Sequence, residues 1–169
     1  MPKYKKKITR QMDYEEFKEA IQDLPIMRQA FLTVLFFAGV RVSEALALTP
    51  NDISCTTDTI YIQFLRLKGS KQTDPIPLPR RDALLWLCEQ EEEPFPFSRT
   101  TGWRIVKQTF PDEELYPHFF RQNRFTNVAE NYGLATMINF SGLAPTSVSH
   151  YIAKVDIKKV GKALLEEVV

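Results

Sequence analysis

The stretch FFAGVRVSEALALTPNDI, residues 36–53, is apolar almost throughout and is typical of a helix, a turn at Gly39 and a second helix. Arg41 lies just past the glycine, between two segments that are apolar enough to be buried. An arginine keeps its proton in a protein, so a guanidinium near a core needs an anionic partner. Glu44, three residues further on, is one candidate partner, and an anion outside this chain is the other.

The segments before this stretch predict two more helices. In residues 12–24, Asp13 is followed three residues later by Glu16, which is a capping-box arrangement, and the apolar residues recur at helical spacing. Residues 27–39 are apolar enough to form a central helix that ends at the glycine. We therefore expect a helical core around the opening stretch.

The segments after it predict a small β-hairpin. TIYIQFLRL, residues 59–67, is β-branched and aromatic, as strands are. PIPLP, residues 75–79, is expected to be an edge strand, because its prolines cannot donate to a ladder. Lys68 and Lys71 lie in the turn between the two segments.

The rest of the chain is predicted to be helical, over residues 80–93, 98–110, 118–133, 134–142, 144–155 and 156–169. The sequence shows no internal repeat and no low-complexity linker. We therefore predict an α+β, predominantly helical domain with one small antiparallel sheet. We expect residues 1–10 to be a basic arm, residues 11–155 the domain itself, and residues 156–169 a C-terminal helix.

The composition is that of an ordinary soluble globular protein, with 44% apolar and 25% charged residues. The net charge of +1 favours no particular partner, but the charges are unevenly distributed. Residues 1–10 hold four lysines and one arginine, and residues 94–111 hold basic residues and no acid. A basic face suits a phosphate backbone, whereas a solvated mobile terminus is the alternative for residues 1–10.

The cysteines and histidines are too few for a metal site. Cys55 and Cys88 form neither a disulfide framework nor a metal-ligand spacing, and His118 and His150 are the two histidines. We therefore expect chemistry without a metal. The longest apolar run, residues 30–42, is too short and interrupted to span a bilayer. There is no signal peptide, so a cytoplasmic protein with no membrane partner is the expectation.

Several side chains suit the chemistry of a phosphodiester. Arg41 lies beside Glu44, and His118 and Arg121 are three residues apart in HFFR, on one face of a predicted helix. Tyr151 follows near the C-terminus. Two arginines can hold the non-bridging phosphate oxygens and stabilise the charge that develops there in phosphoryl transfer. A tyrosine is a poor nucleophile at neutral pH unless its neighbours activate it.

The order of these segments resembles the catalytic domain of the tyrosine recombinases, the family of phage and archaeal-virus integrases and chromosome-dimer resolvases. Four segments carry the resemblance: AGVRVSEALALTPNDI at 38–53, LKGSKQTDPIPLP at 67–79, YPHFFRQNRFTNVAENYG at 116–133 and HYIAKV at 150–155. Each alone is weak, but all four in the order of the family are hard to obtain by chance. The resemblance covers nearly the whole chain, from about Arg10 to Val155.

The resemblance implies a role for five residues. Arg41 and Arg121 would grip the scissile phosphate, and His118 would transfer a proton or hydrogen-bond that phosphate. Lys68 would protonate the 5′-hydroxyl leaving group, and Tyr151 would attack to form a 3′-phosphotyrosyl bond. Lys68 is preferred to Lys71 as this proton donor, because it lies nearer to the first predicted strand.

The resemblance also implies supporting residues and partners. Glu44 would orient the first arginine, and Lys71, Arg124 and His150 are accessory candidates. The covalent bond retains the energy of the broken phosphodiester, so no cofactor, metal or ATP is expected. The expected partners are double-stranded DNA and further copies of the chain in a synaptic tetramer, in which residues 156–169 are exchanged between protomers.

The sequence departs from the family at two points. The family usually has a histidine or tryptophan several residues before the tyrosine, where this chain has Gly142 or Leu143, neither of which has a side-chain donor. Family members usually also carry an N-terminal DNA-clamping domain, and this chain begins where the catalytic domain begins. Either a truncated chain or a natural one-domain protein is consistent with this.

Each candidate residue also has a structural interpretation. In that interpretation, Arg41 and Glu44 would form an ordinary ion pair, and Arg121 would face solvent and pair with Glu130 or another acid. Arg124 covers apolar surface with its stem. Tyr151 would be a core residue, and His118 would lie at the start of a helix without a role in the site.

Other nucleophiles and other functions remain open from the sequence. Tyr116 and Tyr132 are rival nucleophiles that flank the histidine helix. A type IB topoisomerase-like enzyme uses the same chemistry without synapsis. A DNA-binding module that has lost cleavage and a helical adaptor are the alternatives from other classes.

Overall fold

The apolar stretch before Gly39 forms the helix α2, Ile26–Ala38, against which the other elements pack. Every residue from Ala30 to Phe36 is buried. The helix ends at Gly39 in the left-handed conformation, with φ 63°, and the N–H of this glycine donates to the carbonyl of Leu35. Glycine adopts this conformation without a Cβ penalty, so the position of the turn follows from the sequence.

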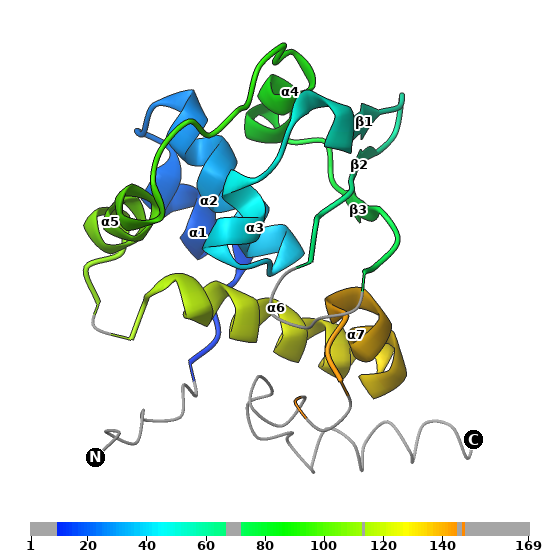
Figure 1. The fold of residues 1–169 in the computed structure, drawn as a ribbon. Helices are drawn as coiled ribbons and strands as arrows, with labels where there is room; N and C mark the ends of the chain where they lie inside the picture. Colours follow the sequence, from blue (N-terminus) through cyan, green and yellow to red (C-terminus); the bar gives the residue numbers. More distant parts are fainter. Residues whose placement is uncertain (1–9, 67–71, 113, 145–146, 148–169) are drawn as a thin grey trace, which may run out of the picture.

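The computed structural model describes residues 10–66, 72–112, 114–144 and 147. Within these ranges the elements besides α2 are α1 Tyr14–Ile21, α3 Val42–Leu46, the 3₁₀ helix η1 Pro50–Asp52, β1 Ile53–Cys55, β2 Ile60–Ile62, β3 Ile76–Leu78, α4 Asp82–Cys88, α5 Arg99–Thr109, α6 Pro117–Tyr132 and α7 Leu134–Ser141 (Figure 1). The predicted helices over residues 144–155 and 156–169 fall almost wholly outside them.

The helix starts follow local capping chemistry. The side chain of Asp13 accepts from the N–H of Glu16 at the start of α1, as the capping box predicts. Ser98 accepts from the N–H of Thr101 at the start of α5. Pro117 occupies the first turn of α6, where its missing N–H costs nothing.

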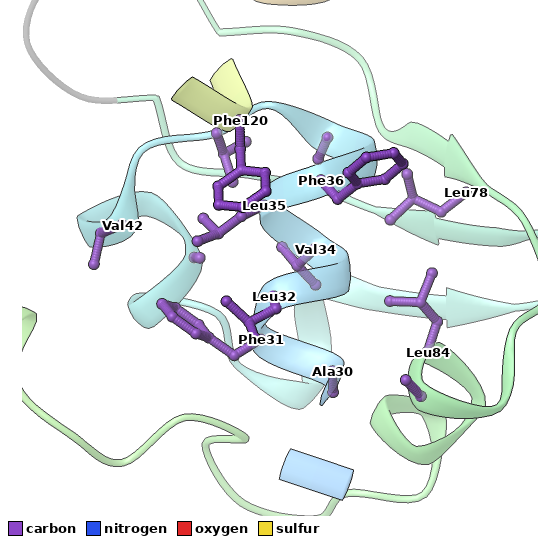
Figure 2. Close-up of a cluster of buried hydrophobic side chains, with 14 of the residues drawn as sticks. Ala30, Phe31, Leu32, Val34, Leu35, Phe36, Val42, Leu78, Leu84 and Phe120 are labelled. Atoms are coloured by element: carbon purple, nitrogen blue, oxygen red, sulfur yellow. The ribbon is translucent and has the colours of Figure 1, made fainter. Parts of the chain in front are cut away.

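Aromatic side chains fill the core on one side of α2. The ring of Phe17 stacks on that of Phe36 with centroids 4.3 Å apart, and it meets the ring of Phe120 edge-on at 6.1 Å. Figure 2 shows Leu35, Phe36 and Phe120 close together, with Leu78 of β3 beyond them. Full burial of each such side chain contributes about 1.5–3 kcal/mol relative to its exposure, so this cluster fixes α6 against α2.

The sheet is antiparallel in the order β1-β2-β3. Ile60 pairs with Leu78, and both are buried, whereas the alternate pair of Tyr61 and Pro77 faces outward. The prediction of an edge strand at 75–79 is confirmed. The strand predicted over residues 59–67 is much shorter in the structure, where the paired residues of β2 end at Ile62.

The prediction that the cysteines form no disulfide is wrong. Cys55 at the end of β1 is bonded to Cys88 at the end of α4, with Cα atoms 6.2 Å apart. They are 33 residues apart in sequence, and the packing of α4 on β1 brings them together. Spacing along the chain carries no information about such a tertiary contact.

The last two described helices close the fold. In Figure 1, α6 runs below α2 and α3, and α7 follows at its far end, below the sheet. Met12 donates its N–H to Oδ1 of Asn123 at 2.9 Å, and the amide nitrogen of Asn123 donates back to the carbonyl of Met12 at 3.1 Å. This pair of hydrogen bonds fastens the segment before α1 to α6. In the described part of the chain, no helix has both the length and the apolarity needed to cross a bilayer.

Candidate active site

Arg41 and Glu44 form the ion pair that the sequence predicts. Nη1 of Arg41 lies 2.7 Å from Oε1 of Glu44, and the glutamate is completely buried. Arg41 is the residue just before α3, so its backbone is still extended, with φ −71° and ψ 153°. Its side chain retains 16% exposure. The carboxylate thus holds a guanidinium that still reaches the surface.

A second arginine, which we did not predict, shares this carboxylate. Nη1 of Arg66 lies 3.4 Å from Oε2 of Glu44, and neither side chain has any exposure. Burial lowers the pKa of Arg66 and Glu44 opposes that shift, while the nearby Arg41 lowers the pKa further. A signal was present in the sequence, because Arg66 continues the alternation of the inward-facing residues Ile60, Ile62 and Phe64.

Arg121 lies on α6 against the turn that precedes α3. Its Nη1 donates to the carbonyl of Gly39 at 2.9 Å, and its guanidinium lies 4.6 Å from the ring centroid of Phe125. Only 1% of the residue is exposed. The alternative in which Arg121 faces solvent is therefore wrong. Gly39 is two residues before Arg41, so the fold brings the second predicted arginine onto the turn that carries the first.

Arg124, the accessory candidate, is anchored to α2. Its Nε donates to the carbonyl of Phe36 at 3.1 Å, and Nη1 donates to Oδ1 of Asn127 at 3.0 Å. Its guanidinium also lies 5.3 Å from the ring centroids of Phe36 and Phe37. Burial lowers the pKa of Arg124 to about 10. These contacts agree with the alternative in which this side chain covers apolar surface and caps the end of α2.

His118 is exposed in the first turn of α6, three residues before the buried Arg121. The two side chains therefore differ in burial although they are close on the helix. Of the rival nucleophiles, Tyr116 directly precedes α6, and its ring stacks on Trp103 with centroids 6.2 Å apart. Burial raises the pKa of Tyr116, which makes its phenol harder to ionise. Tyr132 ends α6, about 20 Å along the axis from His118.

Gly142 and Leu143, where the sequence departs from the family, have structural roles. Gly142 is left-handed, with φ 69°, and its N–H donates to the carbonyl of Ile138 to end α7. Leu143 is buried against Phe125 and Met137. These residues close α7 onto α6, and their side chains supply no hydrogen-bond donor.

Four predicted site residues lie outside the described residues: Lys68, Lys71, His150 and Tyr151. The other five, and Arg66, come from the start of α3, the segment that follows β2, and α6. In the described ranges no three His, Cys, Asp or Glu side chains are grouped so that they could hold a metal ion.

The fold that carries these arginines is that of the tyrosine recombinases. The XerH site-specific recombinase, in a crystal structure bound to its difH substrate before cleavage, superposes with a TM-score of 0.73 at 17% identity. The match covers 95% of this chain and 55% of the XerH chain. The predicted α+β, mainly helical fold with a small antiparallel sheet is thereby confirmed.

Two curated proteins are similar in sequence. Tyrosine recombinase XerC of Bacillus licheniformis is 27% identical over 192 residues, which cover 94% of this chain and 62% of XerC. Tyrosine recombinase XerD of Halalkalibacterium halodurans is 23% identical over 191 residues, which cover 95% of this chain and 63% of XerD. The chain thus spans less than two thirds of these relatives. No family model matches the chain. The similarities in sequence and structure confirm that the chain is related to the tyrosine recombinases and integrases.

Proposed function

We propose that this chain cleaves and rejoins DNA as the catalytic part of a site-specific recombinase or integrase. The observation that carries the proposal is the hydrogen bond of Arg121 to the carbonyl of Gly39. It places Arg121 on the turn that precedes Arg41, although the two predicted phosphate ligands are far apart in sequence. The curated relatives are named tyrosine recombinases, and the XerH structures are described as complexes with a DNA substrate before and after cleavage.

The two arginines bind the scissile phosphate in this proposal. Arg41 is partly exposed and is held by the buried carboxylate of Glu44, so its guanidinium is oriented before DNA arrives. Arg121 is 1% exposed in the free chain, so its guanidinium has to be uncovered when DNA binds. Two guanidiniums on one phosphate stabilise the charge that spreads over its non-bridging oxygens in the transition state.

The reaction is a transesterification at the scissile phosphorus. The phenol oxygen of Tyr151 attacks the phosphorus, and the bond from phosphorus to the 5′ oxygen breaks. Lys68 gives a proton to that oxygen. The phenol releases its own proton as it attacks, and His118 accepts this proton or, where solvent accepts it, hydrogen-bonds the phosphate. The phosphodiester becomes a 3′-phosphotyrosyl bond of similar energy, so a 5′-hydroxyl of another strand can reverse the step. The step therefore consumes no ATP, and in this proposal the two guanidiniums supply the positive charge at the phosphate in place of a metal ion.

The partners in this proposal are double-stranded DNA and further copies of the chain. A synaptic tetramer on DNA would bring two duplexes together, and exchange of residues 156–169 would link neighbouring protomers. The exposed His118 and the partly exposed Arg41 would lie on the side that meets DNA.

A DNA-binding module that has lost cleavage is the second candidate function. It is favoured by Gly142 and Leu143, which cap and pack α7 where the family usually has a donor side chain. In this alternative the arginines still hold a phosphate, but the transition state has one stabilising group fewer. Each missing donor of this type typically costs about 10²–10³ in rate.

Covalent trapping distinguishes the two functions. The substrates are duplexes of randomised sequence that carry a nick, so that the cleaved fragment diffuses away and strands the protein on DNA. Wild-type protein should give an adduct that resists detergent, and Tyr151→Phe should give none. Tyr132→Phe is the matched control, because it changes an exposed tyrosine and should keep the adduct. Salt-dependent binding with no adduct from the wild type would support the binding module, and no binding at all would contradict both functions.

A further inference from the structure

We propose that Arg66 is a positioning residue that fixes Arg41, through Glu44, relative to Gln72 and Thr73. This inference rests on the proposed function, in which Arg41 binds the phosphate and Lys68, which lies between Arg66 and Gln72 in the sequence, protonates the leaving group. All three guanidinium nitrogens of Arg66 have partners within the protein, so in this proposal it acts through its neighbours and not on the phosphate.

The first step is the shared carboxylate. Oε1 of Glu44 accepts from Arg41 at 2.7 Å, and Oε2 lies 3.4 Å from Nη1 of Arg66. A carboxylate held at both oxygens has a fixed plane, whereas one held at a single oxygen can rotate. Arg66 thus fixes the direction in which Glu44 holds the guanidinium of Arg41.

The second step concerns Gln72 and Thr73. The backbone N–H of Arg66 donates to Oε1 of Gln72 at 3.0 Å, and Nε2 of Gln72 donates to the carbonyl of Arg66 at 2.9 Å. Nε of the Arg66 side chain lies 3.3 Å from Oγ1 of Thr73. Arg66, Gln72 and Thr73 are therefore tied to one another and, through the guanidinium of Arg66, to Glu44.

The third step is the end of α7. Nη2 of Arg66 donates to the carbonyl of Phe140 at 3.1 Å. Carbonyls in the last turn of a helix lack intrahelical partners and carry the negative end of the helix dipole, so a guanidinium is favoured there. The side chain of Arg66 thus contacts Glu44 of α3, Thr73, and the last turn of α7.

This arrangement is better explained by orientation than by stability. A buried ion pair often contributes no more stability than well-packed apolar residues of the same volume, because desolvation offsets the attraction. Orientation of the groups that contact the substrate does require fixed supports, since a misplacement of about 1 Å can cost about 100-fold in rate.

The test compares Arg66→Met and Arg66→Lys with wild type on a nicked duplex selected by covalent trapping. Adduct rates are measured at temperatures where circular dichroism shows each variant folded. Arg66→Met should lower the rate about 100-fold. Its dissociation constant for the duplex should change less than about threefold, because no phosphate contact is lost. Arg66→Lys should be intermediate, because one ammonium can reach Glu44 but not all three partners.

A substrate with sulfur in place of the bridging 5′ oxygen gives a readout that general destabilisation does not move. A thiolate leaves without a proton, so this substrate does not depend on Lys68. Arg66→Met should therefore be less impaired on the sulfur substrate than on the oxygen substrate. Equal impairment on both substrates would overturn the inference, as would a wild-type rate on the oxygen substrate.

Two further variants keep the test decisive. Thr73→Val removes only one contact of Arg66 and is expected to fold if Arg66→Met does not. Thr73→Val should also be less impaired on the sulfur substrate than on the oxygen substrate, and equal impairment on both would overturn the inference. Arg81→Met is the matched control, because Arg81 is exposed and stacks on Tyr14 away from Glu44.

If wild type forms no adduct, the proposed function fails and the inference falls with it. An adduct from wild type with unaffected Arg66 variants sinks the inference alone.

Discussion

The charge balance around Glu44 determines how the predicted site is built. One buried carboxylate serves two guanidiniums, of which that of Arg41 reaches the surface and that of Arg66 does not. The sequence predicts the pair of Arg41 and Glu44, because the two residues are three apart on one turn. Arg66 is 22 residues after Glu44 in the chain, and its contact with this carboxylate depends on how the segment that follows β2 lies beside α3.

Replacement of Glu44 tests this balance. Glu44→Gln leaves both guanidiniums without their anion in a buried place, and we expect the free energy of unfolding to fall by about 3–5 kcal/mol. Urea denaturation measures it. The control Glu91→Gln changes an exposed glutamate and should have an effect of less than about 0.5 kcal/mol. A loss for Glu44→Gln as small as that of the control would contradict the description of this ion network.

Gly39 is the second residue on which the site depends. A Cβ at this position would lie 3.0 Å from Cβ of Arg124 and 3.1 Å from Cε1 of Phe125, and φ is +63°. We expect Gly39→Ala to destabilise the fold by at least about 1–2 kcal/mol from backbone strain, with a further loss from the clash with α6. Thermal unfolding measures the loss, and an unchanged melting temperature would contradict both the left-handed turn at Gly39 and the close approach of α6.

At the scale of elements, the helices were predictable and the sheet only in part. Capping residues and helical periodicity are local signals, and they predicted α1, α2, α5 and α6. We did not predict β1, because three residues with one half-buried side chain show no alternation. The strand exists because β2 pairs with it and because α4 packs on it.

The bond between Cys55 and Cys88 joins these two elements and can be tested directly. It closes a loop of 33 residues, for which chain entropy predicts a contribution of about 3–4 kcal/mol. Reduction with dithiothreitol should lower the melting temperature of the wild type. The double variant Cys55→Ser and Cys88→Ser should melt at that lower temperature with or without the reductant. An identical melting curve for oxidised and reduced wild type would show that the bond does not stabilise the fold.

At the scale of the whole molecule, the site is assembled from distant parts of the chain. Arg121 comes from α6, 82 residues after Gly39, and the two meet because α6 packs along α2. The order of the four motifs predicts which residues should take part, and the structure brings Arg121 onto the turn that precedes Arg41. It does not predict that Arg121 is almost completely buried, since burial follows from the packing of the helices.

The central claim is that Tyr151 attacks a phosphate held by Arg41 and Arg121, and the position of the covalent bond tests it most directly. The adduct from the nicked duplex is digested with a nuclease and a protease, and tandem mass spectrometry locates the nucleotide on the peptide. The account predicts the nucleotide on Tyr151. A nucleotide on Tyr116, Tyr132 or any other residue would contradict it.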